Sequence, residues 1–214
     1  IVIVGAGFGG VATALGLERV FRHDNLIEIT IIDKRDSHVF NSNLYEAATA
    51  EEELVSISQV KRSVSVPLSE IFQGKKVTVI TAEVSAIDQT GKTLQAGSRK
   101  IPFDYLITGF GSVSDDFGIP GVAEFAIPLK TLRDAFAIRS RLAFVMDSHR
   151  MDVNKKNIRI VVAGGGYTGV ELAAELAGEM EYLAWKNSYP YEKIEITIVE
   201  AMSQVIAGFS TKLS

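Results

Sequence analysis

Ile1–Gly10, IVIVGAGFGG, is the segment most informative about the fold, because a run of β-branched residues leads directly into a turn rich in glycine. Ile1–Val4 is typical of a strand buried on both faces of a parallel sheet. Val11–Phe21 places apolar residues at helical spacing, and Ile27–Ile32 is predicted as a second strand. The order of strand, glycine turn, helix and strand predicts a βαβ unit at the start of the chain.

The glycine turn fits the pattern G-x-G-x-x-G. The first glycine allows a tight turn, the second lets the backbone approach a pyrophosphate, and the third lets helix and strand pack closely. The helix N-terminus that follows favours phosphate groups. Asp33 ends the second strand, where a carboxylate can accept hydrogen bonds from ribose hydroxyls. We therefore predict a dinucleotide site made of Gly5, Gly7, Phe8, Gly9, Gly10 and Asp33; a glycine-rich turn without a nucleotide is the alternative.

The same order of features returns in the second half of the chain. Ile158–Ala163 is a predicted strand, a second glycine turn follows it, and Val170–Trp185 has helical periodicity. Ile194–Val199 is a further predicted strand, and Glu200 closes it as Asp33 closes the first unit. We predict a second dinucleotide site made of Gly164, Gly166, Tyr167, Thr168, Gly169 and Glu200.

The residues after each strand-end acid bear on the choice of nucleotide. An acid favours a ribose without a 2′-phosphate, and Ala201–Gln204 supplies no Arg or Lys that could hold one. The second site is therefore predicted to take NADH rather than NADPH. Lys34 and Arg35 follow Asp33, so Lys34 is a candidate cofactor contact in the first site. Two solvated surface charges are the alternative interpretation.

Two dinucleotide sites in one chain suggest two cofactors that exchange a hydride, as when FAD carries the redox chemistry and the protein orients it. Glu171, early in the second helix, is the candidate catalytic residue beside the reacting rings; an acid stabilised by the helix dipole is the alternative. Glu175 is predicted to be structural. His38 is a candidate neighbour of a cofactor, whereas His23 and His149 are interpreted as solvated helix ends.

Composition excludes several classes of protein. The chain has 214 residues, 22 Lys and Arg against 26 Asp and Glu, and no Cys. This balance argues against a nucleic-acid partner. Without Cys there is no disulfide framework, thiol nucleophile or Cys-ligated metal site, and the three His residues show no metal-binding spacing. No apolar run reaches the roughly 18–20 residues of a membrane span. A cytoplasmic location is the default expectation.

The two glycine turns also organise the chain. We predict an α/β fold with two Rossmann-like, three-layer domains, residues 1–117 and residues 118–214, the second of them incomplete. Gly109–Gly121 is interpreted as a linker because it is rich in glycine. Further short strands are predicted at residues 77–81, 84–88, 92–95, 100–101 and 104–108, and helices at 67–72 and 131–149. The helix aromatics Phe136, Phe144 and Trp185 are predicted to lie in the core.

Eight segments distributed along the chain carry a family resemblance: Ile1–Gly10, Ile31–Asp33, His38–Thr49, Val66–Phe72, Phe103–Ser112, Leu129–Ala135, Val161–Leu176 and Val199–Ala201. Together they resemble the FAD flavoproteins with two dinucleotide-binding domains, of the pyridine nucleotide-disulfide oxidoreductase type. Within this group they are most similar to the type II NADH dehydrogenases, or NADH:quinone oxidoreductases.

The resemblance implies FAD in the first domain and NADH in the second. Asp33 would hold the adenosine ribose of FAD, the backbone around Val84 would meet the adenine, and Gly109 and Gly111 would lie near the flavin phosphates. Glu171 matches the family's acid at the nicotinamide–flavin junction. NADH would reduce the flavin, which would then reduce a quinone at the inner face of the cell membrane without proton pumping. A homodimer is left open.

Three departures from the family keep alternatives open. Ser42 and Asn43 stand where the family usually has Pro and Leu, and Gly109–Gly111 replaces an Ala-Thr-Gly turn. Family members are also longer, so we expect a truncated chain without the C-terminal region that reaches the membrane. The alternatives are a ferredoxin or rubredoxin reductase and a catalytically incomplete nucleotide-binding fragment. We expect the isolated chain to retain FAD weakly or not at all, because half of the pocket would be missing.

Overall fold

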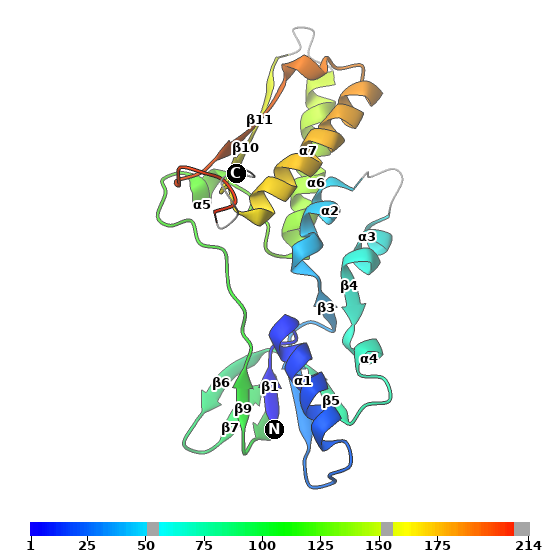
Figure 1. Cartoon of the computed structure of the whole chain (residues 1–214), viewed down its shortest axis with the longest axis vertical. Helices are drawn as coiled ribbons and strands as arrows, with labels where there is room; N and C mark the ends of the chain where they lie inside the picture. Colours follow the sequence, from blue (N-terminus) through cyan, green and yellow to red (C-terminus); the bar gives the residue numbers. More distant parts are fainter. Residues whose placement is uncertain (51–55, 151–155, 208–214) are drawn as a thin grey trace. The chain divides into compact units, whose positions relative to one another are not determined.

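The computed structural model describes residues 1–50, 56–150 and 156–207, and Figure 1 shows their helices and strands. They form two compact units. The first joins Ile1–Val39 to Ser65–Val113, and the second joins Phe40–Val64 to the residues from Ser114 onward. The chain therefore leaves the first unit twice, whereas a single boundary between residues 117 and 118 was expected. The assignment of one cofactor to each domain remains a prediction.

The centre of the first unit is a parallel four-stranded sheet in the order β5-β2-β1-β9. Its strands are β1 (Val2–Val4), β2 (Ile29–Asp33), β5 (Val77–Thr81) and β9 (Leu106–Thr108). β1 pairs with β2 on one side and with β9 on the other. The strand order therefore reverses beside β1, and in open α/β sheets ligands bind at the carboxyl end of such a switch point.

Alternating residues of the central strands form the core on both faces of this sheet. On one face Ile3 and Ile31 pack with Ala14 of α1 (Phe8–Phe21). On the other face Val2 and Val4 pack with residues of a three-stranded antiparallel sheet. That sheet consists of β6 (Val84–Asp88), β7 (Thr93–Ala96) and β8 (Arg99–Pro102). The unit thus has the three layers that the sequence predicted.

The first unit also contains a two-stranded sheet, whose first strand follows β2 in the chain. Its strands, β3 (Ser37–Val39) and β4 (Ser65–Pro67), are antiparallel, and His38 lies opposite Val66. Pairing with a strand far along the chain makes the residues of β3 extended. The helix α4 (Leu68–Ile71) begins after Pro67, as predicted from the fixed φ of proline at a helix start.

The second unit repeats the strand–helix–strand order. β10 (Ile158–Ala163) and β11 (Ile194–Val199) are parallel, and α7 (Tyr167–Lys186) connects them. Leu142 and Met146 of α6 (Leu132–Arg150) pack with Leu176 and Met180 of α7. Further elements are α2 (Leu44–Thr49), α3 (Ile57–Val64), α5 (Val122–Phe125) and the 3-10 helices η1 (Asn41–Asn43) and η2 (Tyr191–Lys193). Gly109–Gly121, the expected linker, contains no helix or strand.

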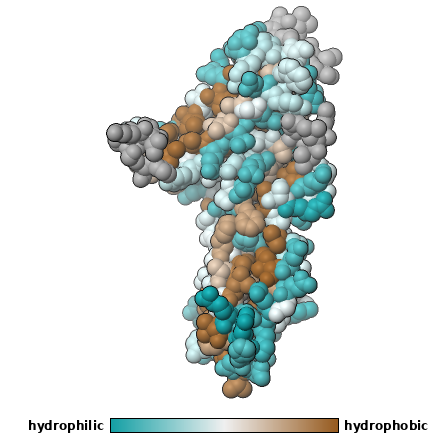
Figure 2. All heavy atoms as spheres, turned by 45° about the vertical axis from the view of Figure 1, so that its right-hand side comes forward, coloured by the Kyte–Doolittle hydropathy of each residue, from teal (hydrophilic) through white to brown (hydrophobic). Residues whose placement is uncertain are grey.

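Two of the aromatic residues expected in the core are exposed instead. Phe144 is 59% exposed and Trp185 is 78% exposed. Leu142 and Met146 occupy the inner face of α6, so Phe144, two residues from each, projects to the opposite side. Figure 2 shows apolar patches among the polar surface on the face that it draws. No helix in the described part of the chain combines the length and hydropathy needed to cross a bilayer.

Candidate functional site

The first glycine turn, Gly5–Gly10, has the shape that its three key glycines predict. Gly5 has a φ of +102°, and a Cβ there would lie 2.1 Å from the carbonyl oxygen of Gly109. A Cβ on Gly10 would lie 1.8 Å from the carbonyl oxygen of Gly5. Both positions therefore exclude a side chain. Gly5 does so because of its backbone angle and its close approach to Gly109, and Gly10 because the helix packs closely against the turn.

Gly7, the second key glycine, faces open space. It precedes α1, and its carbonyl accepts a hydrogen bond from the Val11 N–H at 3.0 Å. A Cβ on Gly7 would meet no described atom within 4 Å, and α1 has no side-chain cap in the described part of the chain. The geometry fits a turn whose N–H groups are available to a phosphate.

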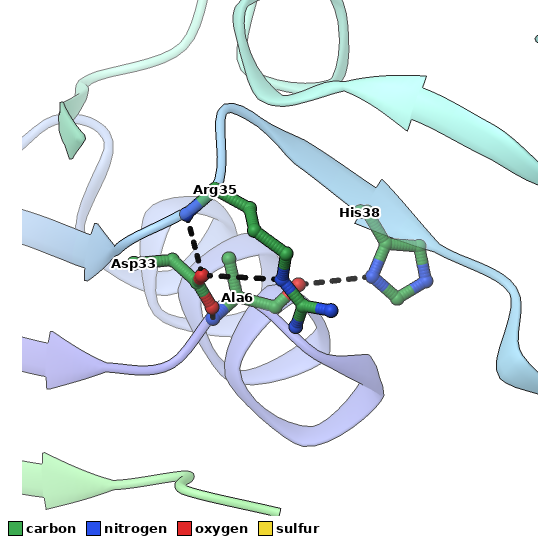
Figure 3. Close-up of polar contacts among 4 residues, drawn as sticks. All are labelled: Ala6, Asp33, Arg35 and His38. Carbon is green, nitrogen blue, oxygen red and sulfur yellow. Dashed lines mark hydrogen bonds and ion pairs between the residues drawn. The ribbon is translucent and has the colours of Figure 1, made fainter. Parts of the chain in front are cut away.

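Asp33 ties the end of β2 to this turn, as Figure 3 shows. Its Oδ2 accepts a hydrogen bond from the Ala6 N–H at 2.7 Å, and its Oδ1 accepts one from the Arg35 N–H at 2.9 Å. Arg35 Nε lies 3.5 Å from Oδ1. Lys34, the predicted cofactor contact, and Arg35 are both exposed, and the side chain of Arg35 forms the ion pair with the acid.

His38 lies beside the same turn. Its ring is buried, and Nδ1 lies 3.0 Å from the carbonyl oxygen of Ala6 (Figure 3). The ring also meets the ring of Phe8 edge-on, with 4.8 Å between the centroids. The sequence named His38 as a candidate neighbour of a cofactor, and the structure places it against the predicted phosphate-binding turn.

Three further predicted cofactor residues lie in this unit. Gly109 approaches the turn closely: its N–H donates to the Val4 carbonyl at 2.7 Å. Gly111 has a φ of +74°, which favours glycine. Val84 begins β6 and packs, half-buried, against the core beneath the sheet. Their contacts with FAD remain predictions.

The second glycine turn, Gly164–Gly169, repeats this geometry. Gly164 has a φ of +108°, and a Cβ on Gly169 would lie 1.9 Å from the carbonyl oxygen of Gly164. Gly166 precedes α7, and a Cβ there would meet no described atom within 4 Å. Unlike Gly5, Gly164 has no described neighbour that a Cβ would meet, so only its backbone angle favours glycine.

Glu200 accepts a hydrogen bond from the second turn, as Asp33 does from the first. Its Oε2 accepts a hydrogen bond from the Gly165 N–H at 2.6 Å, and its Oε1 accepts one from the Met202 N–H at 2.9 Å. The backbone N–H groups of Met202 and Gly165 stabilise the carboxylate and lower the pKa of Glu200. The group is therefore an anion at neutral pH.

A small hollow of about 120 Å³ opens beside Glu200 and the second turn. The chain after β11 bends back over the turn, and the Ile206 N–H donates to the Gly165 carbonyl at 2.7 Å. The residues that line the hollow are Gly165, Gly166, Tyr167, Glu200, Met202, Gln204, Ile206 and Ala207. Tyr167 is a predicted cofactor residue, whereas Gln204, Ile206 and Ala207 were not predicted. Thr168 is exposed in the first turn of α7.

Glu171, the predicted catalytic residue, lies exposed on α7 one turn before Glu175. Tyr45 of α2 was not predicted, and it lies within electrostatic reach of both acids. Burial raises the pKa of Tyr45 above 10.0, and the negative charges of Glu171, Glu46 and Glu175 raise it further. A tyrosine in a half-polar helix gives no signal in the sequence that it faces acids on another helix.

The sequence of the whole chain, residues 1–214, matches the family model for pyridine nucleotide-disulphide oxidoreductases. The chain belongs to this oxidoreductase family. The family resemblance predicted from the sequence is thus confirmed. Residues 1–214 contain no Cys, so they cannot form the disulfide to which the family's name refers.

Curated relatives indicate which kind of family member the chain resembles. The type II NADH:quinone oxidoreductase of Staphylococcus saprophyticus is 28% identical over 215 residues, which cover 100% of the chain and 52% of that protein. The protein of the same description from Staphylococcus aureus is 29% identical over 217 residues, with the same coverage. The chain spans about half the length of the curated relatives it matches.

Solved structures confirm the predicted Rossmann-like α/β fold. The NDH2 structure from Plasmodium falciparum in complex with NADH has a TM-score of 0.82 at 22% identity, covering 100% of the chain and 44% of that protein. The sulfide:quinone oxidoreductase of Aquifex aeolicus has a TM-score of 0.66 at 23% identity, covering 92% and 42%. At these identities the likeness supports the fold alone.

Proposed function

We propose that the protein carrying this chain is an FAD-dependent NADH:quinone oxidoreductase. The observation that carries the proposal is an arrangement that occurs in both units and is here called the cradle. Each cradle has a G-x-G-x-x-G turn whose second glycine faces open space. The acid at the end of the following strand accepts a hydrogen bond from a backbone N–H of that turn. The similarity to type II NADH:quinone oxidoreductases supports the choice of cofactor and acceptor.

The residues of the first cradle fit FAD. The N-terminus of α1 offers its N–H groups to the pyrophosphate, and the open side of Gly7 leaves room for it. Asp33 is already oriented by two backbone N–H groups, and its Oδ2, away from the Arg35 side chain, keeps a second acceptor site for a ribose hydroxyl. FAD, when bound, supplies a two-electron carrier between hydride donor and acceptor.

The second cradle fits NADH. Glu200 is held ionised beside the hollow, and its charge repels a 2′-phosphate while its oxygens accept from ribose hydroxyls. Glu171 is proposed as the catalytic acid near the reacting rings. Quinone as acceptor, attachment to the inner face of the membrane and a homodimeric state follow from the resemblance and are part of the proposal.

The test is a steady-state assay of the complete gene product, purified with its flavin. We expect NADH oxidation that depends on a short-chain soluble quinone, with NADH strongly preferred over NADPH. A protein that reduces a ferredoxin or rubredoxin but no quinone would show that the acceptor is wrong. A protein that binds no flavin would overturn the proposed function altogether.

A further inference from the structure

We propose that His38 is a positioning residue of the first glycine turn. Its imidazole holds the Ala6 carbonyl and so keeps the turn in the shape that receives the cofactor pyrophosphate. The inference rests on the proposed function, because that function assigns the FAD pyrophosphate to this turn. Neither the acid-and-glycine motif nor the family similarity assigns a role to this side chain.

The hydrogen bond defines the state of the ring. Nδ1 of His38 lies 3.0 Å from the carbonyl oxygen of Ala6, and a carbonyl oxygen can only accept. Nδ1 therefore carries a proton. The side chain and its partner are 4% and 2% exposed, and the Phe8 ring meets the imidazole at 88°. Burial and this edge-on contact fix the orientation of the ring. Loss of the Nδ1 donor would therefore remove a hydrogen bond from the buried carbonyl of Ala6.

Ala6 is held from both sides. Its N–H donates to Asp33 Oδ2 at 2.7 Å, and its carbonyl accepts from His38. It lies between Gly5 and Gly7, where glycine gives the backbone most conformational freedom. The two bonds fix the orientation of the peptide groups on either side of Ala6. They thereby set where the N–H groups at the start of α1 point.

The second glycine turn supports this interpretation. Gly165 stands at the position that corresponds to Ala6, and its N–H donates to Glu200 at 2.6 Å. Its carbonyl also accepts a hydrogen bond, from the backbone N–H of Ile206 at 2.7 Å. In both turns, therefore, the N–H and the carbonyl of the corresponding residue are both hydrogen-bonded. Among the described residues, a side chain bonds to the carbonyl in the first turn and a backbone N–H does so in the second, so substitution can remove the donor in the first turn.

The experiment compares His38→Asn with His38→Leu in the complete gene product. Asn places an amide N–H at the position of Nδ1, whereas Leu fills space without a donor. We expect His38→Leu to raise the Kd for FAD about tenfold, which corresponds to about one lost hydrogen bond to a buried group. His38→Asn should stay within about twofold of wild type. The Kd is measured by quenching of flavin fluorescence on the deflavinated protein.

His149 provides a matched control. Its Nδ1 also lies near a backbone carbonyl, that of Val145 at 2.8 Å, and its ring also meets an aromatic ring, that of Tyr189. It lies near the end of α6 and is part of neither glycine turn. His149→Leu should leave the Kd for FAD unchanged even if it lowers the melting temperature. Equal Kd values for His38→Leu and wild type, or for His38→Leu and His38→Asn, would overturn the proposal.

A second readout needs no cofactor. Nitrogen-15 NMR of the histidine side chains distinguishes a proton on Nδ1 from one on Nε2. We expect Nδ1 of His38 to be protonated in the flavin-free protein, and a ring protonated on Nε2 alone would overturn the proposal. If wild type binds no FAD, the proposed function fails, and the protonated nitrogen still decides whether His38 holds the turn. This readout also serves if His38→Leu does not fold.

Discussion

Asp33 and Glu200 make the same two hydrogen bonds in two different units. Each accepts the N–H of the residue after the first glycine of its turn, at 2.7 Å for Asp33 and 2.6 Å for Glu200. Each also accepts, at 2.9 Å, the N–H of the residue two positions further along the chain. The duplication seen in the sequence therefore extends to the atoms that orient the carboxylates.

The charge of Glu200 should make the free energy of unfolding depend on pH in the acidic range. Hydrogen bonds from Met202 and Gly165 lower its pKa from the usual 4.5, so the folded state favours the anion. Its stabilisation is complete above pH 4.5 and is lost as pH falls through the lowered pKa. We expect Glu200→Gln to reduce the free energy of unfolding at neutral pH, with a difference from wild type that shrinks below pH 4.5.

The measurement is urea unfolding of both proteins at several pH values. Glu192→Gln is the control, because Glu192 is exposed in η2 outside the turn. It should give a much smaller difference at neutral pH. A difference between wild type and Glu200→Gln that grows as pH falls would contradict the assigned cause of the pKa shift.

Exchanging charge at the end of β11 should change the choice of nucleotide. Glu200→Ala combined with Ala201→Arg removes the carboxylate and adds a cation that can hold a 2′-phosphate. We expect the ratio of kcat/KM for NADH over NADPH to fall by at least about tenfold, or about 1.4 kcal/mol. Ala201→Arg alone is the control, because it retains Glu200. An unchanged ratio in the double variant would show that Glu200 does not contact the ribose.

Local patterns predicted those features of the fold that neighbouring residues determine. Ile158–Ala163 and Ile194–Val199 have the predicted bounds, since β-branched runs end where glycine or acid begins. The pairing of β3 with β4 was missed, because it joins segments that are distant in the chain. Burial of His38 follows from that pairing and could not be predicted without it. Trp185 was misplaced because helical spacing alone does not say which side of a helix is covered.

The second and third key glycines of each turn should respond differently to substitution. A Cβ on Gly10 would lie 1.8 Å from a backbone oxygen, whereas a Cβ on Gly7 would enter open space. We expect Gly10→Ala to cost about 3 kcal/mol or more of unfolding free energy. Gly7→Ala should cost less than about 1 kcal/mol and still raise the Kd for FAD about tenfold, because its methyl group would enter the space proposed for the pyrophosphate.

Thermal unfolding and FAD titration of both variants test this separation. The second turn supplies the matched pair: Gly169→Ala should destabilise the fold, and Gly166→Ala should raise the KM for NADH without a comparable loss of stability. Wild-type FAD affinity in Gly7→Ala would show that the pyrophosphate does not pass this glycine. A stable Gly10→Ala would contradict the close packing of α1 on β1.

Tyr45 reports on the charge of the predicted catalytic acid. Its pKa is raised first by burial and then by the charges of Glu171, Glu46 and Glu175. Removing a nearby negative charge makes the phenolate less unfavourable, so Glu171→Gln should lower the pKa of Tyr45 part of the way towards 10.0. Ultraviolet titration of tyrosinate, with Tyr45→Phe subtracted, measures this pKa. Glu181→Gln, an exposed change on the same helix, is the control and should leave it unchanged. If Glu171→Gln also leaves the pKa unchanged, the carboxylate of Glu171 does not face α2.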